Sequence, residues 1–453
     1  MTCPRWCRAG GVRWSLLLCL LAAPASAQGT QTDSTLTLAA AIRLALATHP
    51  SVGAATAALD EASAARGEAA ATRWPSLHLA SSVTRFQEPM LVTPIHGFVP
   101  GQTPPFDETL IQAGATVGYT LFDGGARGAR IAQARARSEV ASATLDASEQ
   151  TLIATVVATY VGALARQEIL AAHDQRLAAL EAEQTRVEQL LAVGRAAEVD
   201  RLRANAALAE ARAARVRLAQ DLDFTERTLG RLVAERDLHA TDLVPIHMPD
   251  EPPTDREELV TRAMRASPVV EQARRQVAAA SAGISIARGL RRPEVRLIGN
   301  YIDRGSAAGD FRAEWNAGIQ LAYPLFTGGT VERRVERATA TRSGAEQALK
   351  LAELEVTGLV DQSLGAIREA RARAASLEQA VAGFTEVARI EQLRLATEVG
   401  TQAEYFRAEA DLLTVRAELA GARYAEITAR AELARAVGCL SPSWVATNLG
   451  GGQ

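Results

Sequence analysis

The sequence predicts a mixed fold in which long α-helical hairpins alternate with β-hairpins of the transmembrane type, and three observations predict it. The chain of 453 residues repeats itself, since Leu-Phe-Asp-Gly-Gly at 121–125 recurs as Leu-Phe-Thr-Gly-Gly at 325–329. Each copy precedes a very long run of helix-forming residues, and each follows a stretch with period-two alternation. A duplication over nearly the whole chain indicates one continuous architecture.

The first residues have the features of a secretory signal peptide. Three arginines lie among the first thirteen residues, residues 16–23 are apolar, and Ala-Ser-Ala at 25–27 resembles a cleavage site, which predicts a signal peptide over 1–27. Cys19 leaves a lipoprotein open as an alternative. The leucines just before it lack the small residue expected beside a lipidated cysteine.

Composition narrows the class of protein. The net charge is −3, and removal of the three signal arginines leaves about −6, which argues against a nucleic-acid partner. After the signal, Cys439 is the only cysteine, so no disulfide framework is expected. No run of roughly 18 apolar residues follows the signal, so membrane contact would have to come from strands.

Two long stretches, from 126 to about 192 and from 330 to about 398, contain no proline and are rich in Ala, Leu, Arg and Glu. These residues favour helices, and a run of this length would extend roughly 100 Å at about 1.5 Å per residue. Further helical stretches at 199–229 and 403–437 are expected to fold back on them as antiparallel hairpins.

Both long stretches end at a Val-Gly pair, Val193-Gly194 and Val399-Gly400. Because glycine permits the backbone conformations that reverse a helix, we expect tip turns at 193–194 and 399–400. Plain coiled-coil stalks would account for these helices, but they would not account for the strands.

Four segments alternate between apolar and polar side chains. The apolar set is Leu77, Leu79, Val83, Ala115, Val117, Tyr119, Leu121, Val295, Leu297, Tyr301, Trp315, Ala317, Ile319, Leu321, Tyr323 and Leu325. The opposing set is Ser76, His78, Ser82, Thr84, Gln112, Thr116, Thr120, Glu294, Arg296, Asn300, Asn316, Gly318 and Gln320. Any half-buried sheet shows this pattern, but its place between a signal peptide and long helices favours membrane strands.

The expected boundaries follow from these elements. A proline-rich loop at 87–110 joins the first two strands, whereas a short loop at 303–314 joins the last two. We expect a signal peptide (1–27), a first repeat (28–230), a proline-rich linker (231–254), a second repeat (255–438) and a C-terminal tail (439–453).

Each strand-to-helix turn is expected at a glycine pair. The turns comprise Asp123, Gly124, Gly125, Thr327, Gly328 and Gly329, with Asp123 able to cap the helix that follows it. Four strands cannot close a barrel, which needs about eight, so three copies supplying about twelve strands are predicted. The helices would continue that barrel as a periplasmic α-barrel.

The duplicated plan resembles the TolC-like outer membrane efflux protein (outer membrane factor) family. The resemblance rests on the order of several motifs from about 36 to 437: Ala-Leu-Ala-Thr-His-Pro at 45–50, Arg-Ala-Ser-Pro at 265–268, Tyr-Pro-Leu-Phe-Thr-Gly-Gly at 323–329, and the two Val-Gly pairs. It implies a homotrimeric channel-tunnel in the outer membrane. It further implies a periplasmic adaptor (membrane fusion) protein and an inner-membrane RND or ABC pump as partners.

The resemblance also implies roles at the tips. Val193, Gly194, Val399 and Gly400 match the family's adaptor-contact pairs, and Asp200 matches an aspartate that closes the channel by bonding to a neighbouring hairpin. A helix cap or a solvated charge is the alternative for Asp200.

The second tip departs from the family pattern. Some relatives ring the pore with two aspartates, where this chain has Phe406 and Glu409, and Gln402 replaces an arginine of the closing network. A weaker ionic gate is therefore expected, with Glu409 as the candidate for a cation-binding ring.

Catalytic and cofactor motifs are missing from the sequence, which has no His-Glu-x-x-His, P-loop or dinucleotide-binding pattern. We therefore expect no enzyme, no metal and no cofactor. The predicted function is a passive export duct of a tripartite efflux or type I secretion system. A periplasmic coiled-coil scaffold and a degradative periplasmic enzyme are the alternatives. The sequence does not distinguish the pump class or the exported substrate.

Overall fold

The computed structural model describes residues 35–94, 100–101, 103–235, 238–246, 255–309, 311–397 and 399–449. Its helices are α1 (Leu38–Thr48), α2 (Pro50–Ala71), α3 (Ala126–Ala192), α4 (Glu198–Val233), α5 (Arg256–Ala266), α6 (Pro268–Gly289), α7 (Thr330–Ala396), α8 (Gln402–Val437) and α9 (Pro442–Asn448), with a 3-10 turn η1 (Ala240–Asp242). Its strands are β1 (Ser76–Leu91), β2 (Phe106–Asp123), β3 (Glu294–Ser306) and β4 (Arg312–Ala322).

The two repeats have helices of equal length. α1 and α5 each have 11 residues, α2 and α6 have 22, α3 and α7 have 67, and α4 and α8 have 36. Because α3 begins at Ala126 and α7 at Thr330, a residue of the first α-hairpin corresponds to the one 204 positions later. The predicted helix from 126 to about 192 is confirmed, whereas the second long helix ends at Ala396, two residues before its expected end.

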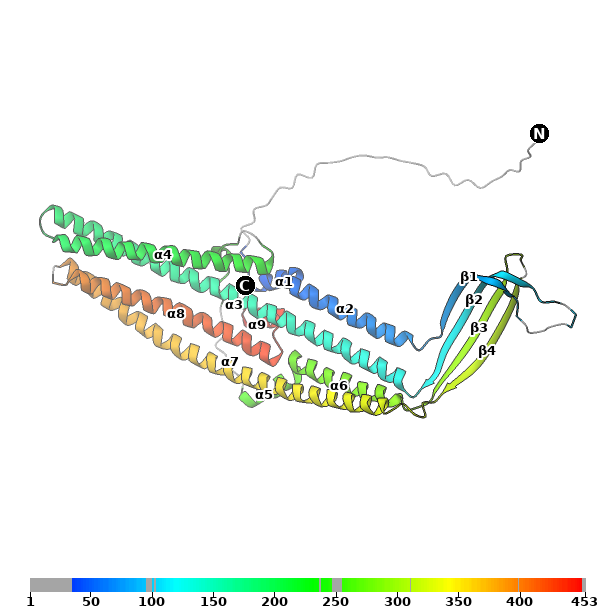
Figure 1. Ribbon diagram of the computed structural model, residues 1–453. Coiled ribbons are helices and arrows are strands. Elements are labelled where there is room, and N and C mark those ends of the chain that lie inside the picture. The colour runs from blue at the N-terminus through cyan, green and yellow to red at the C-terminus, as the bar shows by residue number, and fades with distance from the viewer. Residues whose placement is uncertain are drawn as a thin grey trace, which may run out of the picture. The chain divides into compact units, whose positions relative to one another are not determined.

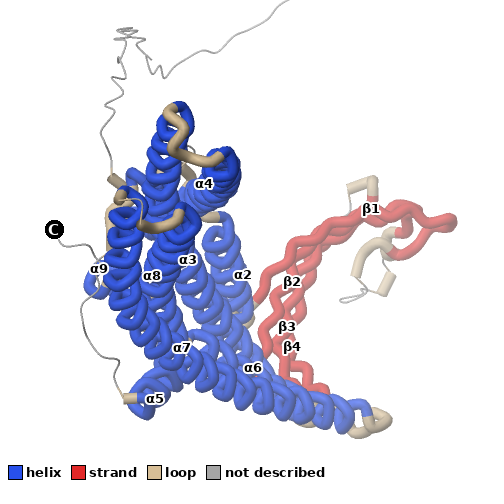
Figure 2. The backbone as a smooth tube through the Cα atoms, turned by 90° about the vertical axis from the view of Figure 1, so that its left-hand side faces the viewer, coloured by secondary structure: helices blue, strands red, loops and turns tan. Residues whose placement is uncertain are grey.

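The strands form one antiparallel sheet in the order β1-β2-β3-β4, continuing from the same ends of the helices (Figures 1 and 2). The hairpin turns α3–α4 and α7–α8 lie at the opposite ends of the long helices (Figure 1). Within each hairpin the two helices pack along each other, and α3 also contacts α8, which joins the two hairpins.

The sheet has one apolar and one polar face, as the alternation predicts. Tyr119, Leu297 and Ile319 are register neighbours on the apolar face. On the polar face Thr116 donates to Asn300 (3.0 Å), which donates to Asn316 (2.9 Å). Large side chains of the apolar face are exposed, including Leu79 at 81%, Trp315 at 77% and Ile319 at 70%. A face of this kind requires an apolar partner outside the chain.

Three details of the strand predictions are wrong. Leu121 lies at a register shift, so that Phe122 takes the next apolar position opposite Val295. β4 ends at Ala322, which leaves Tyr323 and Leu325 beyond it. The loop expected at 87–110 is shorter, because β1 extends to Leu91 and β2 begins at Phe106.

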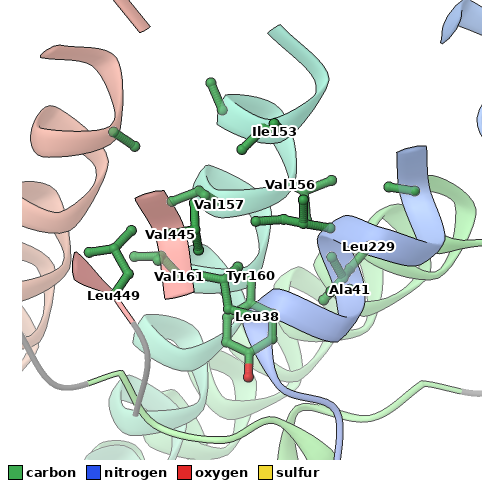
Figure 3. Packing of buried hydrophobic residues seen from close by; sticks show 14 of the residues in the cluster. Leu38, Ala41, Ile153, Val156, Val157, Tyr160, Val161, Leu229, Val445 and Leu449 are labelled. Atoms are coloured by element: carbon green, nitrogen blue, oxygen red, sulfur yellow. The ribbon is translucent and has the colours of Figure 1, made fainter. Parts of the chain in front are cut away.

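The largest apolar core lies where α1, α3, α4, α8 and α9 meet (Figure 3). Tyr160 is fully buried there, and its hydroxyl lies 2.7 Å from the carbonyl oxygen of Leu36 and 2.8 Å from that of Val244. Val445 and Leu449, both fully buried, bring the tail beyond residue 438 into this core. These contacts hold the ends of both repeats against the middle of α3.

Some expected features fall outside the described residues. The signal peptide 1–27 with Cys19 does so, as do the linker prolines Pro249, Pro252 and Pro253. Among the described helices, one window of α3 is long and apolar enough to cross a membrane, and 56% of that window is buried inside the fold. Burial of this extent is typical of a core helix.

Candidate functional site

The first tip turn is built around Gly194. The amide of Gly194 donates to the carbonyl of Leu191 (3.0 Å), and that of Arg195 donates to Leu190 (2.8 Å), which is the Schellman pattern of a helix C-terminus. Gly194 has a φ of +73°, a conformation that glycine adopts without strain. Val193 beside it is 68% exposed.

The second tip turn differs from the first. The amide of Val399 donates to the carbonyl of Arg394, five residues earlier (2.9 Å), as the amide of Arg195 donates to that of Leu190 in the first tip. Val399 therefore occupies the position that Arg195 has in the first tip. Gly400 is not in the left-handed region. A Cβ there would instead lie 2.9 Å from Cβ of Arg394, so this glycine provides close approach. The two Val-Gly pairs are therefore not equivalent, although Val399 is also exposed, at 73%.

Asp200 lies at the third position of α4 and caps its own helix. Its carboxylate accepts from the amide of Ala197 (3.4 Å) and lies 3.8 Å from the Arg203 guanidinium. Glu404 has the same place in α8, where it accepts from the amide of Thr401 (2.9 Å) while the Thr401 hydroxyl accepts from the amide of Glu404 (3.2 Å). Within one chain the structure places Asp200 in a capping role, with no bond to the second hairpin among the described residues.

Gln402 joins the two hairpins near their tips. Its side-chain amide is 7% exposed and donates to the Glu183 carboxylate of α3 (3.2 Å). Glu183 is 5% exposed and also accepts from the Arg186 guanidinium at 2.7 and 2.8 Å. The side-chain oxygen of Gln402 has no partner among the described residues. Glu183 is not among the site residues that the sequence predicts. Its place between Leu180 and Val187, on the buried stripe of α3, could have indicated that it is buried.

Phe406 and Glu409 lie on the same side of α8 as Gln402. Phe406 packs against the apolar cluster of Leu180, Leu208 and Ala211 in the first hairpin. Burial raises the pKa of the Glu409 carboxyl, an effect that Arg416 and Arg176 oppose. Burial, together with Glu409 and Glu183, raises the pKa of Tyr405 to about 12.

The contacts of α3 with α8 include several polar ones. Besides the Glu183–Gln402 pair, Arg416 donates to Gln175 (2.9 Å) and Tyr424 donates to Glu168 (2.9 Å). Inside the second hairpin, Ala388, Ala408 and Leu412 form a buried apolar cluster, whereas the apolar contact that Phe406 makes with the first hairpin is only partly buried. We call the α3–α8 contact from Glu168 to Glu183 the hairpin seam. When polar groups separate, water can replace the hydrogen-bond partner of each. Their separation therefore costs less free energy than exposing an apolar cluster to water.

The two strand-to-helix turns are built alike but capped differently. All four glycines have positive φ: +70° at Gly124, +88° at Gly125, +59° at Gly328 and +78° at Gly329. The predicted cap is confirmed at the first turn, where the Asp123 carboxylate accepts from the amide of Arg127. Thr327 at the second turn makes no such bond.

Comparison with known proteins agrees with this architecture. The model of the outer membrane efflux protein family matches residues 41–235 and again residues 259–439. The chain belongs to this family. The two matched segments begin in α1 and α5, and each continues two residues past the last helix of its repeat, α4 or α8.

Several known proteins are similar to this chain. Protein CyaE of Bordetella pertussis is 30% identical over 317 residues, which is 66% of this chain and 65% of that relative's length. The outer membrane protein VceC of Vibrio cholerae is 20% identical with a TM-score of 0.75, covering 88% of this chain and 96% of VceC. The open state of the MtrE outer membrane channel of Neisseria gonorrhoeae is 18% identical with a TM-score of 0.73, covering 89% and 90%.

These likenesses confirm the predicted fold class and the resemblance to the family. Like the solved outer membrane channels, the chain combines long helices with a small β-sheet. As a member of the outer membrane efflux protein family, it belongs to the outer membrane and extends into the periplasm.

Proposed function

We propose that the chain is one subunit of a homotrimeric outer-membrane channel-tunnel, a passive duct of a tripartite efflux or type I secretion system. The exposed apolar face of the open four-stranded sheet is the observation that carries this proposal. About eight strands are needed to close a barrel, and three copies would supply about twelve. Open sheet edges are not tolerated in lipid, so assembly would accompany insertion.

The long hairpins would form the periplasmic part of the duct. Their exposed tip residues Val193 and Val399 would contact a periplasmic adaptor protein, which in turn would bind an inner-membrane RND or ABC pump. The pump would supply the energy and select the cargo, while this subunit would act as a conduit without catalytic activity of its own.

A pair of adjacent strand positions tests the membrane role. Leu79→Arg places a charge on the apolar face, at a cost of about 2–4 kcal/mol near the middle of a bilayer. His78→Arg places the same charge on the polar face. We expect wild type and His78→Arg to give heat-resistant trimers in outer-membrane fractions, and Leu79→Arg to give none. A soluble periplasmic monomer in all three cases would favour the coiled-coil scaffold instead.

We propose that the hairpin seam is where the tips open. Adaptor docking would favour an arrangement in which the second hairpin moves away from the first, with Gln402 leaving Glu183. MtrE, which has a similar fold, has been solved in an open state. Asp200 would join the gate only if it exchanged its capping bond for one to a neighbouring chain.

Single-channel conductance tests the opening step. Gln402→Ala removes the bond to Glu183, so the closed channel is expected to show a larger conductance. Glu198 holds the corresponding position in the first hairpin, is exposed and pairs with Arg201, so Glu198→Ala is the matched control. Equal conductance in the two variants would argue against a latch at Gln402.

Glu409 remains the candidate for a cation-binding ring. Three carboxylates around a pore would hold multivalent cations and block conductance. Glu409→Ala is expected to weaken that block, and an unchanged block would remove Glu409 from the gate.

A further inference from the structure

A cavity of about 710 Å³ lies where the sheet meets the long helices. It is bordered by the C-terminal ends of α2 and α6, the first turns of α3 and α7, and the adjoining ends of β2, β3 and β4. Neither the tips nor the hairpin seam is near it in the fold (Figure 1), since it lies beside the strands. The predicted duct function assigns it no role.

The cavity wall carries an excess of positive charge. Five arginines line it, Arg127, Arg130, Arg292, Arg296 and Arg334, together with only two carboxylates, Asp123 and Glu294. Asp123 pairs with Arg130 (3.3 Å) and Glu294 pairs with Arg296 (2.6 Å). Among the described residues, the other three guanidinium groups therefore have no carboxylate partner.

Those three arginines are held in two different ways. Arg127 donates to the carbonyl of Thr120 (2.8 Å) and Arg292 to that of Gly124 (3.1 Å). Carbonyl bonds fix a guanidinium in place but do not neutralise it. Arg334 is exposed and has no hydrogen bond or ion pair among the described residues. The wall thus offers both fixed and mobile donors to an anion.

The unequal capping of the two repeats adds to this charge. α3 and α7 both begin at the cavity, so the positive ends of both helix dipoles are directed towards it. Asp123 compensates α3, whereas Thr327 provides no side-chain cap for the first amides of α7, and the Glu332 carboxylate in that turn lies 3.6 Å from the Arg291 guanidinium. The first amides of α7 are therefore available to an anion beside Arg334.

The strand residues of the cavity lie on the polar face of the sheet. Thr120 pairs with Arg296, and Glu294 pairs with Ala322, whereas the neighbouring register row Phe122–Val295–Leu321 belongs to the apolar face. In a membrane barrel the polar face lines the interior. If the chain forms the proposed duct, the cavity opens to its lumen, below the two middle strands.

We propose that this cavity is an anion-binding site in the lumen, which three copies would repeat as a cationic belt at the junction of barrel and tunnel. Its ligands would be compact polyanions that carry phosphate groups, because guanidinium groups bind phosphate oxygens in pairs. The lumenal position and the belt of three copies rest on the proposed function. The binding site itself is a property of the folded chain.

Calorimetric titration of the detergent-solubilised protein with tripolyphosphate tests the site directly. One tripolyphosphate should bind per chain, and Arg334→Gln should weaken binding by about tenfold or more, the value of one charge-assisted contact. Arg333→Gln removes the same charge from the next residue of α7, which pairs with Glu336 and does not line the cavity. That control should bind within about twofold of wild type. Circular dichroism checks that both variants fold.

Block of single channels by tripolyphosphate, measured in bilayers of zwitterionic lipid, tests the lumenal position and excludes anionic lipid headgroups as the source of phosphate. Wild type and Arg333→Gln should be blocked, and Arg334→Gln should need about ten times more tripolyphosphate. No binding to wild type, or equal loss in the two variants, would overturn the site. Binding without block of open channels would overturn its lumenal position. Binding by protein that forms no channels would support the site while contradicting the proposed function.

Discussion

The two repeats agree in the length of every helix but differ in how those helices begin and end. The first repeat caps α3 with Asp123 and ends α4 on Ala234, whose φ is +61°. The second gives α7 no side-chain cap and ends α8 on Gly438, whose φ is +81°. Two hairpins that lie side by side reach the same end of the molecule only if their helices have the same length. The capping residues at each helix end, by contrast, can differ with their local surroundings.

The surroundings explain the difference at the C-terminal caps. Ala234 is exposed. Gly438 lies against the end of α5, where a Cβ would be 2.3 Å from the carbonyl oxygen of Ala266. The first repeat therefore tolerates a strained alanine, while the second has room only for glycine. Substitutions at paired positions can test this comparison.

Gly438→Ala should have the largest effect. The new Cβ meets backbone atoms that cannot rotate away, and the left-handed backbone adds its own strain, so the free energy of unfolding should fall by about 3 kcal/mol or more. Thermal unfolding of the detergent-solubilised protein, followed by circular dichroism, measures the loss. Gly421→Ala in the same helix meets nothing within 4 Å and should be neutral or slightly stabilising. Equal losses in both variants would contradict the steric explanation.

Asp123→Ala should have an intermediate effect. It removes the cap of α3, which we expect to cost about 1 kcal/mol of unfolding free energy. Thr327→Ala is the matched change in the second repeat and should cost little, because the Thr327 side chain makes no capping bond. Chemical denaturation of both variants compares the two ends. A larger loss at Thr327 would reverse the comparison.

Ala234→Gly should stabilise the protein modestly. Glycine relieves the left-handed strain but adds freedom to the unfolded chain, so the net gain should be about 0.5–1 kcal/mol. The gain would appear as a higher unfolding temperature. A lower one would mean that contacts of the Ala234 methyl group outweigh the strain.

Much of this fold follows from local sequence, whereas the register of the tips does not. Runs of strong helix formers between glycine turns fix the bounds of α3, and period-two alternation fixes the faces of the strands. Val399 follows Val193 by 206 positions, but α7 follows α3 by 204. The two Val-Gly pairs are therefore two residues away from being structurally equivalent. The residue at which a helix ends depends on how it packs along the whole hairpin. A local sequence motif contains no information about that packing.

The buried part of the candidate site shows the same limit. The place of Glu183 between Leu180 and Val187 indicates the buried stripe of α3, but only the packing of α3 against α8 shows that Glu183 is bonded to Gln402. The caps could be inferred because Asp123 and Asp200 act on amides three or four residues away. Contacts across the hairpin seam join residues more than 200 positions apart in the sequence. A single sequence does not show which of its distant residues lie close together in space.

The smallest predicted effect concerns the pH dependence of the second tip. Burial raises the pKa of Glu409 in the folded chain, so the folded state binds a proton at a higher pH than the unfolded state does. Stability should therefore be greatest below the ordinary glutamate pKa of about 4.5 and fall as the pH rises to the raised value. In the first repeat the corresponding residue is Asn205, which bears no charge and accepts from Gln184 (2.9 Å).

Glu409→Gln should remove this contribution and make the second tip resemble the first. The variant should unfold at a higher temperature than wild type at pH 7, and the difference should disappear near pH 4, where the wild-type carboxyl is already protonated. Glu409→Asp keeps a carboxyl group and should keep the pH dependence. A difference that grows as the pH falls would mean that the charged form of Glu409 is stabilised, through Arg416 and Arg176, more than burial destabilises it.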